Sequence, residues 1–242
     1  MNHLERNRRA WNQESSDNGP WSRPVSPEVI AAARRGDWQV ILTPNKPVPR
    51  DWFGDLQGRE VLGLASGGGQ QVPVLAAAGA IVTSFDLSDV QLEKDRLVAE
   101  REGLPLTCIR GDMADLGVFG DESFDLVISI TALEFIGDYE KAISEMARVC
   151  RKGGRVVVGT RAHLRERGRE HSRRPVLAIH FDECDREHRL GGCRCLVRGL
   201  SLCGALPGRR GDARLHHVAP PTPPARRAGR RRPGAGRGAD PR

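Results

Sequence analysis

The chain has 242 residues, and its 38 Lys and Arg against 31 Asp and Glu give a net charge of +7. This charge is uneven: residues 166–242 carry 18 basic and 8 acidic residues, a net charge of +10, whereas residues 1–165 carry 20 basic and 23 acidic residues, a net charge of −3. The basic composition therefore belongs to the C-terminal third, and it gives no reason to expect a nucleic-acid-binding surface elsewhere.

Residues 1–50 form a segment rich in tryptophan and proline. Trp11, Trp21 and Trp38 lie in it and Trp52 follows directly, which accounts for all four tryptophans. No hydrophobic signal or transit pattern precedes Trp11, so we expect a cytoplasmic protein without a membrane segment. Two interpretations are open: Trp11, Asn12, Gln13 and Trp21 close as a lid over a site, or the tryptophans pack a helical cap against the sheet edge.

Residues 51–165 begin with the most informative pattern in the chain. The apolar stretch from Glu60 to Leu64 is followed by the glycines 67–69 and a helix-forming segment. Glycine allows a sharp turn with positive φ and a close approach of the backbone to a ligand. A second strand, Val82 to Asp86, ends in an acid about 20 residues beyond the glycines, where ribose-binding acids lie. The pattern predicts a nucleoside-binding turn with an acid for the sugar.

Strands and helices alternate through the rest of this segment. Residues 106–110 and 123–129 are predicted to be strands, residues 138–149 a helix with one apolar face, and residues 155–160 a fifth strand. This rhythm predicts an α/β fold, a doubly wound Rossmann-like and mainly parallel sheet. Ligands bind such sheets at the carboxyl ends of the strands, where the strand order reverses.

From Asp51 to Thr160 these residues resemble the class I S-adenosylmethionine-dependent methyltransferases of the small-molecule type, as in the type 11 methyltransferase domains. Gly67 and Gly69 match the last two glycines of that family's loop. Gly63 stands where the family has an acid, and Ala65 stands where it has the first glycine. The resemblance implies S-adenosylmethionine as the cofactor, a small-molecule acceptor, and no membrane or metal.

The resemblance also implies roles for individual residues. Asp86 matches the acid that accepts both ribose hydroxyls, and Asp112 with Met113 matches the pair that flanks adenine. The cofactor-binding residues that it implies are Ala65, Ser66, Gly67, Gly69, Gln70, Asp86, Leu87, Asp112, Met113 and Ser129. Residues 130–136 stand where the family places groups facing the transferred methyl. Glu134, among apolar neighbours, is the candidate catalytic base there, with an exposed helix-capping role as its alternative.

Other interpretations of these residues stay open. A nicotinamide dinucleotide enzyme has the same fold, with the glycine loop opening onto a pyrophosphate. As purely structural residues, Asp86 would cap the helix beginning near Ser88, Asp112 would belong to a turn, and Met113 would fill a gap in the core. Cys108 and Cys150 fit buried small side chains of a cytoplasmic protein better than disulfide partners.

Residues 166–242 change abruptly in composition, with no Lys, Asn, Gln, Met, Trp or Tyr and 18 Arg. They are interpreted as an Arg-, Pro-, Gly- and Ala-rich tail without a packed core. Three origins compete: a shifted reading frame of a GC-rich gene, a basic arm for nucleic acid, or a metal site using residues such as His180, Cys184 and His188. The absence of a CxxC pair argues against the metal site.

Five strands can be identified, whereas a complete sheet of this family has seven, the last two forming a hairpin. The fifth strand is therefore expected to form an open edge. Methyl transfer from S-adenosylmethionine to an acceptor is the predicted function. The alternative is a catalytically silent cofactor- or partner-binding protein with an incomplete methyltransferase fold, suggested by Gly63, Ala65 and the missing hairpin.

Overall fold

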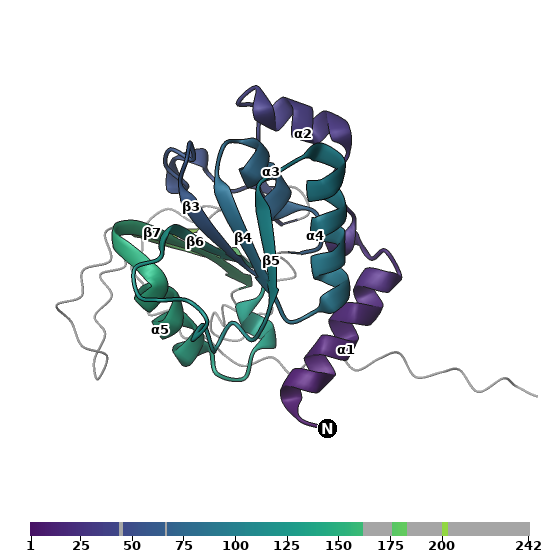
Figure 1. The fold of residues 1–242 in the computed structure, drawn as a ribbon. Helices are drawn as coiled ribbons and strands as arrows, with labels where there is room; N and C mark the ends of the chain where they lie inside the picture. Colours follow the sequence, from purple (N-terminus) through teal and green to yellow (C-terminus); the bar gives the residue numbers. More distant parts are fainter. Residues whose placement is uncertain (44–45, 66, 162–175, 183–199, 203–242) are drawn as a thin grey trace, which may run out of the picture.

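The computed structural model describes residues 1–43, 46–65, 67–161, 176–182 and 200–202. Its centre is a seven-stranded sheet with the strand order β5-β4-β3-β6-β7-β8-β9 (Figure 1). The first five strands in this order are mutually parallel, the sixth pairs antiparallel with the fifth, and the seventh pairs antiparallel with the sixth. Their bounds are Glu60–Leu64 for β3, Ile81–Asp86 for β4, Leu106–Arg110 for β5, Phe124–Ile130 for β6 and Cys150–Arg161 for β7. The predicted α/β fold with a mainly parallel sheet is confirmed.

Side chains of the central strands are buried on both faces of the sheet, as expected for parallel strands covered by helices. On β3, Val61 packs into a cluster that includes residues of α3, Gln71–Ala77. The next residue, Leu62, packs into a separate cluster that includes residues of α5, Tyr139–Val149. This alternation follows from the two-residue period of a strand, and it explains why an almost continuous apolar run appears in the sequence.

The helices begin at capping residues that the sequence provides. The Ser88 hydroxyl accepts a hydrogen bond from the Gln91 amide at the start of α4, Asp89–Glu102. The Asp138 carboxylate accepts from the Lys141 amide at the start of α5. Side-chain oxygens in these positions satisfy amides that lack an intrahelical partner. The helix predicted for residues 138–149 is therefore confirmed, with Asp138 as its cap.

The edge beyond β7 differs from the sequence-based expectation. Strand β8, Val176–Asp182, pairs antiparallel with β7 from Arg155 to Arg161, and β9, Leu200–Leu202, pairs with β8. The expectation that β7 forms an open edge is wrong for this backbone, although β9 is only three residues long. The rest of the tail, including Cys184, His188 and Arg226–Arg232, lies outside the described residues.

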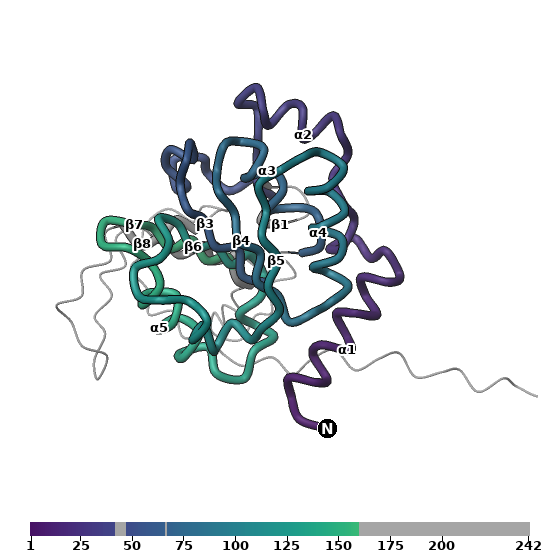
Figure 2. The backbone as a smooth tube through the Cα atoms, viewed as in Figure 1, coloured from purple at the N-terminus to yellow at the C-terminus, as the bar shows by residue number. Residues whose placement is uncertain are grey.

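The N-terminal segment forms a set of short elements around the domain. In Figure 2 the helix α1 runs beside α4, with α2 above it. The elements are α1 (His3–Ser16), η1 (Pro20–Ser22), α2 (Pro27–Arg34), the antiparallel pair β1 (Ile41–Thr43) and β2 (Lys46–Pro47), and η2 (Arg50–Trp52). No helix in the described part of the chain has the length and apolar character needed to cross a membrane.

The four tryptophans divide into two groups. Trp52 is buried in the cluster around α3, and Trp38 packs against that cluster with its ring edge-to-face with Phe53, at 5.4 Å between ring centres. Trp11 and Trp21 instead line a cavity next to the sheet. Trp38 and Trp52 are thus core residues, as the cap interpretation expects, whereas closure of Trp11 and Trp21 as a lid stays a prediction.

Both cysteines in the described domain are free thiols. Cys150 is buried in the core, as expected, whereas Cys108 on β5 is only partly buried. Burial nonetheless raises the pKa of the Cys108 thiol to about 12. The thiol is therefore protonated at neutral pH, and thiolate chemistry is not expected of it.

Candidate functional site

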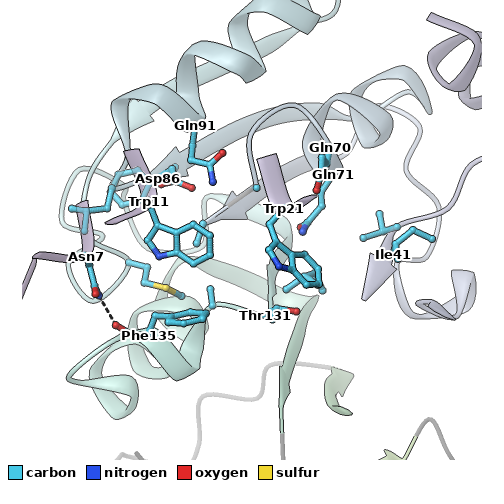
Figure 3. A pocket seen from close by; sticks show the side chains of 18 of the residues that line it. Asn7, Trp11, Trp21, Ile41, Gln70, Gln71, Asp86, Gln91, Thr131 and Phe135 are labelled. Carbon is cyan, nitrogen blue, oxygen red and sulfur yellow. Dashed lines mark hydrogen bonds between the residues drawn. The ribbon is translucent and has the colours of Figure 1, made fainter. Parts of the chain in front are cut away.

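A cavity of about 450 Å³ lies at the carboxyl ends of β3, β4, β5 and β6. The chain runs from β3 through β4 to β5 on one side of the sheet and then returns to form β6 on the other side of β3. The order of strands therefore reverses between β3 and β6, where open α/β sheets bind ligands. Figure 3 shows that residues of α1, η1 and β1 close the cavity opposite the sheet.

The glycine loop between β3 and α3 has the backbone conformation that its sequence predicts. Gly67, Gly68 and Gly69 all have positive φ, at +83°, +63° and +81°. The Gly69 amide donates a 2.5 Å hydrogen bond to Oδ1 of Asp95, and the Gly69 carbonyl accepts from the amide of Val25. Gly67 lines the cavity, whereas Ser66 lies outside the described residues. Both the N-terminal segment and α4 thus hold this loop.

Ala65 precedes the glycines and also has a left-handed backbone, with φ of +50°. Side chains in this region clash with the backbone, at a cost of about 1–2 kcal/mol. The position is therefore one where glycine fits better, and Ala65 stands where the methyltransferase pattern has glycine. Ala65 lines the cavity, so this strain is located at the site.

We expect Ala65→Gly to raise the free energy of unfolding by about 0.5–1 kcal/mol, because relief of the left-handed strain exceeds the entropy cost of glycine. Urea unfolding of both chains measures this difference. Ala31→Gly in the middle of α2 is the matched control and should lower stability by about 0.5–1 kcal/mol. A loss of stability in both variants would contradict the assignment of strain to Ala65.

Asp86 ends β4 and faces the cavity, with only 7% of its surface exposed. Its Oδ1 accepts a 2.8 Å hydrogen bond from the amide of Ser88. Ser88, and not Asp86, caps α4, so the purely structural interpretation of Asp86 as the helix cap is wrong. Leu87, between them, also lines the cavity.

Asp112 and Met113 lie beside Asp86 because β4 and β5 are paired, and a hydrogen bond joins the chain just after β5 to the end of β4. The Gly111 amide donates to the Asp86 carbonyl at 3.1 Å. Glycine is required at 111, since a Cβ there would lie 2.0 Å from the Phe85 ring. Asp112 accepts from the Ala114 amide at 3.0 Å, as expected of a turn residue, and it also lines the cavity. Met113 lines the cavity and contributes to the core.

Several contacts attach the wall formed by the N-terminal segment to the domain. Trp11 contacts Phe135 edge-to-face, at 5.2 Å between ring centres, and the Asn7 side chain donates a hydrogen bond to the Phe135 carbonyl (Figure 3). On the other side, the Lys94 ammonium on α4 donates to the Ser15 carbonyl at 2.5 Å and the Ser22 carbonyl at 2.6 Å. It also donates to Oδ1 of Asn18 at 2.9 Å.

This lysine is half-buried, and burial lowers its pKa, although the nearby Glu14 carboxylate opposes that shift. The ammonium thus gives up part of its hydration and replaces it with three protein acceptors. Such contacts fix the turn between α1 and η1 against α4. Trp11 and Trp21, on either side of this turn, are thereby held over the cavity.

Of the sequence-predicted site residues that the structure describes, Ala65, Gly67, Gln70, Asp86, Leu87, Asp112 and Met113 all line the cavity. Gly69 lies just behind it in the loop. Ser129 is fully buried in β6 and does not line the cavity. Glu134 is half-buried on η3, Leu133–Phe135, between the lining residues Ala132 and Phe135, and does not line the cavity itself.

Thr131 belongs to the predicted segment 130–136 and lines the cavity. It follows β6 with φ of +59°, which is exceptional for a β-branched residue, and its amide donates to the Gly159 carbonyl at 2.6 Å. Other lining residues were not predicted. Gln91 reaches the cavity from the first turn of α4, and Val40 and Ile41 reach it from the segment before β2. The sequence carries no periodic signal for these positions, since tertiary contacts bring them together.

The electrostatic character of the cavity is simple. Among the described residues that line it, Asp86 and Asp112 are the charged side chains, and most of the others are apolar or aromatic. No group of three or more His, Cys, Asp or Glu side chains in the described part of the chain is arranged to hold a metal ion. The cavity therefore suits an organic ligand with hydrogen-bond donors or positive charge at one end.

Comparisons with known proteins agree with this geometry. Residues 62–158 match the family model described as "Methyltransferase domain". The chain is 44% identical over 153 residues to YbaJ of Bacillus subtilis, an uncharacterized methyltransferase, covering 63% of this chain and 60% of that protein. It is 38% identical over 103 residues to phosphatidylethanolamine N-methyltransferase of Cereibacter sphaeroides, covering 42% of this chain and 50% of that protein.

Among solved structures, an arsenic(III) S-adenosylmethionine methyltransferase from Chlamydomonas reinhardtii is similar with a TM-score of 0.44 and 28% identity. The match covers 56% of this chain and 50% of that chain. The chain thus spans between half and three fifths of the length of these relatives. Residues 62–158, where the glycine loop, Asp86, Asp112 and Met113 lie, are thus similar to the methyltransferase domain family.

Proposed function

We propose that this protein binds S-adenosylmethionine in the cavity and transfers its methyl group to a small apolar acceptor. The observation that carries the proposal is the convergence of the glycine loop, Asp86 and the Asp112–Met113 pair on one cavity. These residues fit the cofactor, because the two carboxylates can accept hydrogen bonds from its hydroxyl and amine groups. Their negative charge also suits a cation. No phosphate-binding cation lines the cavity among the described residues, which favours this cofactor over a dinucleotide.

Each residue has a distinct task in this proposal. Asp86 accepts hydrogen bonds from the ribose hydroxyls, Asp112 accepts from the adenine amine, and Met113 covers the ring with its thioether. The bound cofactor supplies an electrophilic methyl group on a sulfonium. The backbone of Gly67 forms the floor beneath the cofactor, where the missing Cβ allows close approach.

The acceptor is expected to contact the wall formed by the N-terminal segment. Trp11, Trp21 and Phe135 present aromatic surface there, and Val25, Val40 and Ile41 add aliphatic surface. Such a wall favours a flat or apolar molecule without negative charge. The protein then contributes by positioning the acceptor and excluding water, which together account for a large part of the barrier reduction in group transfer.

Glu134 stays the candidate base suggested from the sequence, but its side chain does not line the cavity, so we assign it no step here. Asp86 and Asp112 are assigned to the cofactor, so the described lining offers no further titratable group to remove a proton. We therefore expect an acceptor whose nucleophilic atom is reactive without a protein base. The alternative function, a catalytically silent binding protein, is equally consistent with a lining that offers no further titratable group. It differs from the proposed function only in that it does not turn over a methyl donor.

Titration with S-adenosylhomocysteine tests the proposal, with binding measured by calorimetry and by tryptophan emission. We expect saturable binding and a change in emission, because Trp11 and Trp21 line the cavity whereas Trp38 and Trp52 pack in the core. A Trp11→Phe/Trp21→Phe variant should bind without this change in emission. Tighter binding of NAD than of S-adenosylhomocysteine would contradict the cofactor assignment.

A further inference from the structure

Gln91 is a buried side chain that the proposed contacts do not explain. It is the third residue of α4, only 2% of its surface is exposed, and it lines the cavity. Its amide oxygen is buried and accepts no hydrogen bond, a condition that costs about 1–3 kcal/mol. A buried polar group without a partner in a ligand cavity indicates that its partner is the ligand.

The position of Gln91 relative to Asp86 is fixed by the start of α4. The Ser88 amide donates to Asp86, and the Ser88 hydroxyl accepts from the Gln91 amide at 3.1 Å. Side chains in the first turn of a helix point back toward its N-terminus. Figure 3 accordingly shows the amide end of Gln91 directed into the cavity that Asp86 also lines.

Gly68 supplies a second, independent observation. Gly67 and Gly69 match the family pattern, whereas Gly68 between them has no role in it. A Cβ at position 68 would lie 2.0 Å from the amide oxygen of Gln91 and 3.1 Å from its Cδ. The middle glycine therefore makes room for the Gln91 side chain, and the loop and α4 are matched to each other at this point.

We propose that Gln91 is a ligand-binding residue that contacts the ribose together with Asp86. A carboxylate only accepts hydrogen bonds, whereas a primary amide both donates and accepts. The two side chains together complement a vicinal diol, in which each hydroxyl donates one hydrogen bond and accepts another. This inference rests on the proposed function, since it names a further contact in the same nucleoside site.

The test uses the full-length protein and the near-isosteric variant Gln91→Met. Three probes are titrated: S-adenosylhomocysteine and its 2′-deoxy and 3′-deoxy analogues. We expect the variant to bind S-adenosylhomocysteine about 3- to 10-fold more weakly, the effect of one hydrogen bond. The analogue that lacks the contacted hydroxyl should bind both proteins equally. The melting temperature should stay the same or rise, because the variant removes a buried oxygen that has no partner.

Gly68→Ala should reproduce the binding defect by displacing Gln91, and combining it with Gln91→Met should add little. Gly103→Ala is the matched control, because Gly103 has a similar φ of +61° but nothing within 4 Å of a new Cβ. It should leave binding unchanged.

An equal change in affinity for all three probes, or none, would overturn the role of Gln91 while leaving the proposed function intact. A fall in melting temperature together with unaltered discrimination among the probes would show a structural role instead. Failure of the wild-type protein to bind any of the three probes would overturn the proposed function itself.

Discussion

Asp86→Ala should weaken the binding of S-adenosylhomocysteine by about 10- to 100-fold. Hydrogen bonds to a charged group contribute about 1.5–3 kcal/mol, and Asp86 is a nearly buried carboxylate at the end of β4. Calorimetric titration of both proteins measures the change. We expect this to be the largest effect of any single substitution on cofactor binding, because in the proposed function Asp86 accepts hydrogen bonds from both ribose hydroxyls.

Two variants separate the lost contact from secondary effects. Asp86→Asn keeps an acceptor for the Ser88 amide and so preserves the start of α4, but it lacks the negative charge. It should lose less affinity than Asp86→Ala. Asp115→Ala removes the same charge from an exposed acid outside the cavity and should bind like wild type. Equal affinity of Asp86→Ala and wild type would contradict the ribose assignment.

Asp95→Ala should lower the free energy of unfolding by about 2–5 kcal/mol. Asp95 is fully buried on α4, where its two carboxylate oxygens accept from the Gly69 amide at 2.5 Å and the Ser84 hydroxyl at 2.6 Å. The variant removes both hydrogen bonds to this buried carboxylate, and a hydrogen bond to a charged group contributes about 1.5–3 kcal/mol. Urea unfolding followed by circular dichroism measures the loss.

Asp95→Asn is the control for this prediction, because its amide oxygen still accepts from Gly69 and its amide nitrogen can donate to the Ser84 hydroxyl. It should recover most of the stability. If Asp95→Ala unfolds at the same urea concentration as wild type, then the glycine loop does not depend on α4. Comparison of cofactor affinity in the two variants would further show whether loss of stability extends to the loop conformation.

The parts of the site that the sequence predicted share a physical origin. Gly67, Asp86 and Asp112 each lie at or just after the carboxyl end of a strand, and parallel strands bring such positions to one edge of the sheet. Spacing along the chain is therefore enough to place them together. Gln91, Val40 and Ile41 reach the same cavity only because separate elements pack against one another, and no local pattern marks such contacts.

The strand β8 is a different case. Val176–Asp182 contains a short apolar run, the usual indication of a strand, but it lies in a segment whose overall composition argued against folding. Averaging over the 77 residues from 166 to 242 concealed this local signal. Composition is informative about whole segments, and a seven-residue strand is too short to change it.

The contacts of Lys94 have a kinetic consequence. Moving the N-terminal segment away from the cavity requires breaking three hydrogen bonds to one ammonium, which would then have to be hydrated again. An acceptor or product that is covered by this segment would wait for that opening. If the proposed reaction takes place, we therefore expect the opening of the N-terminal segment, and not methyl transfer itself, to limit its turnover, as in other enzymes whose sites open slowly.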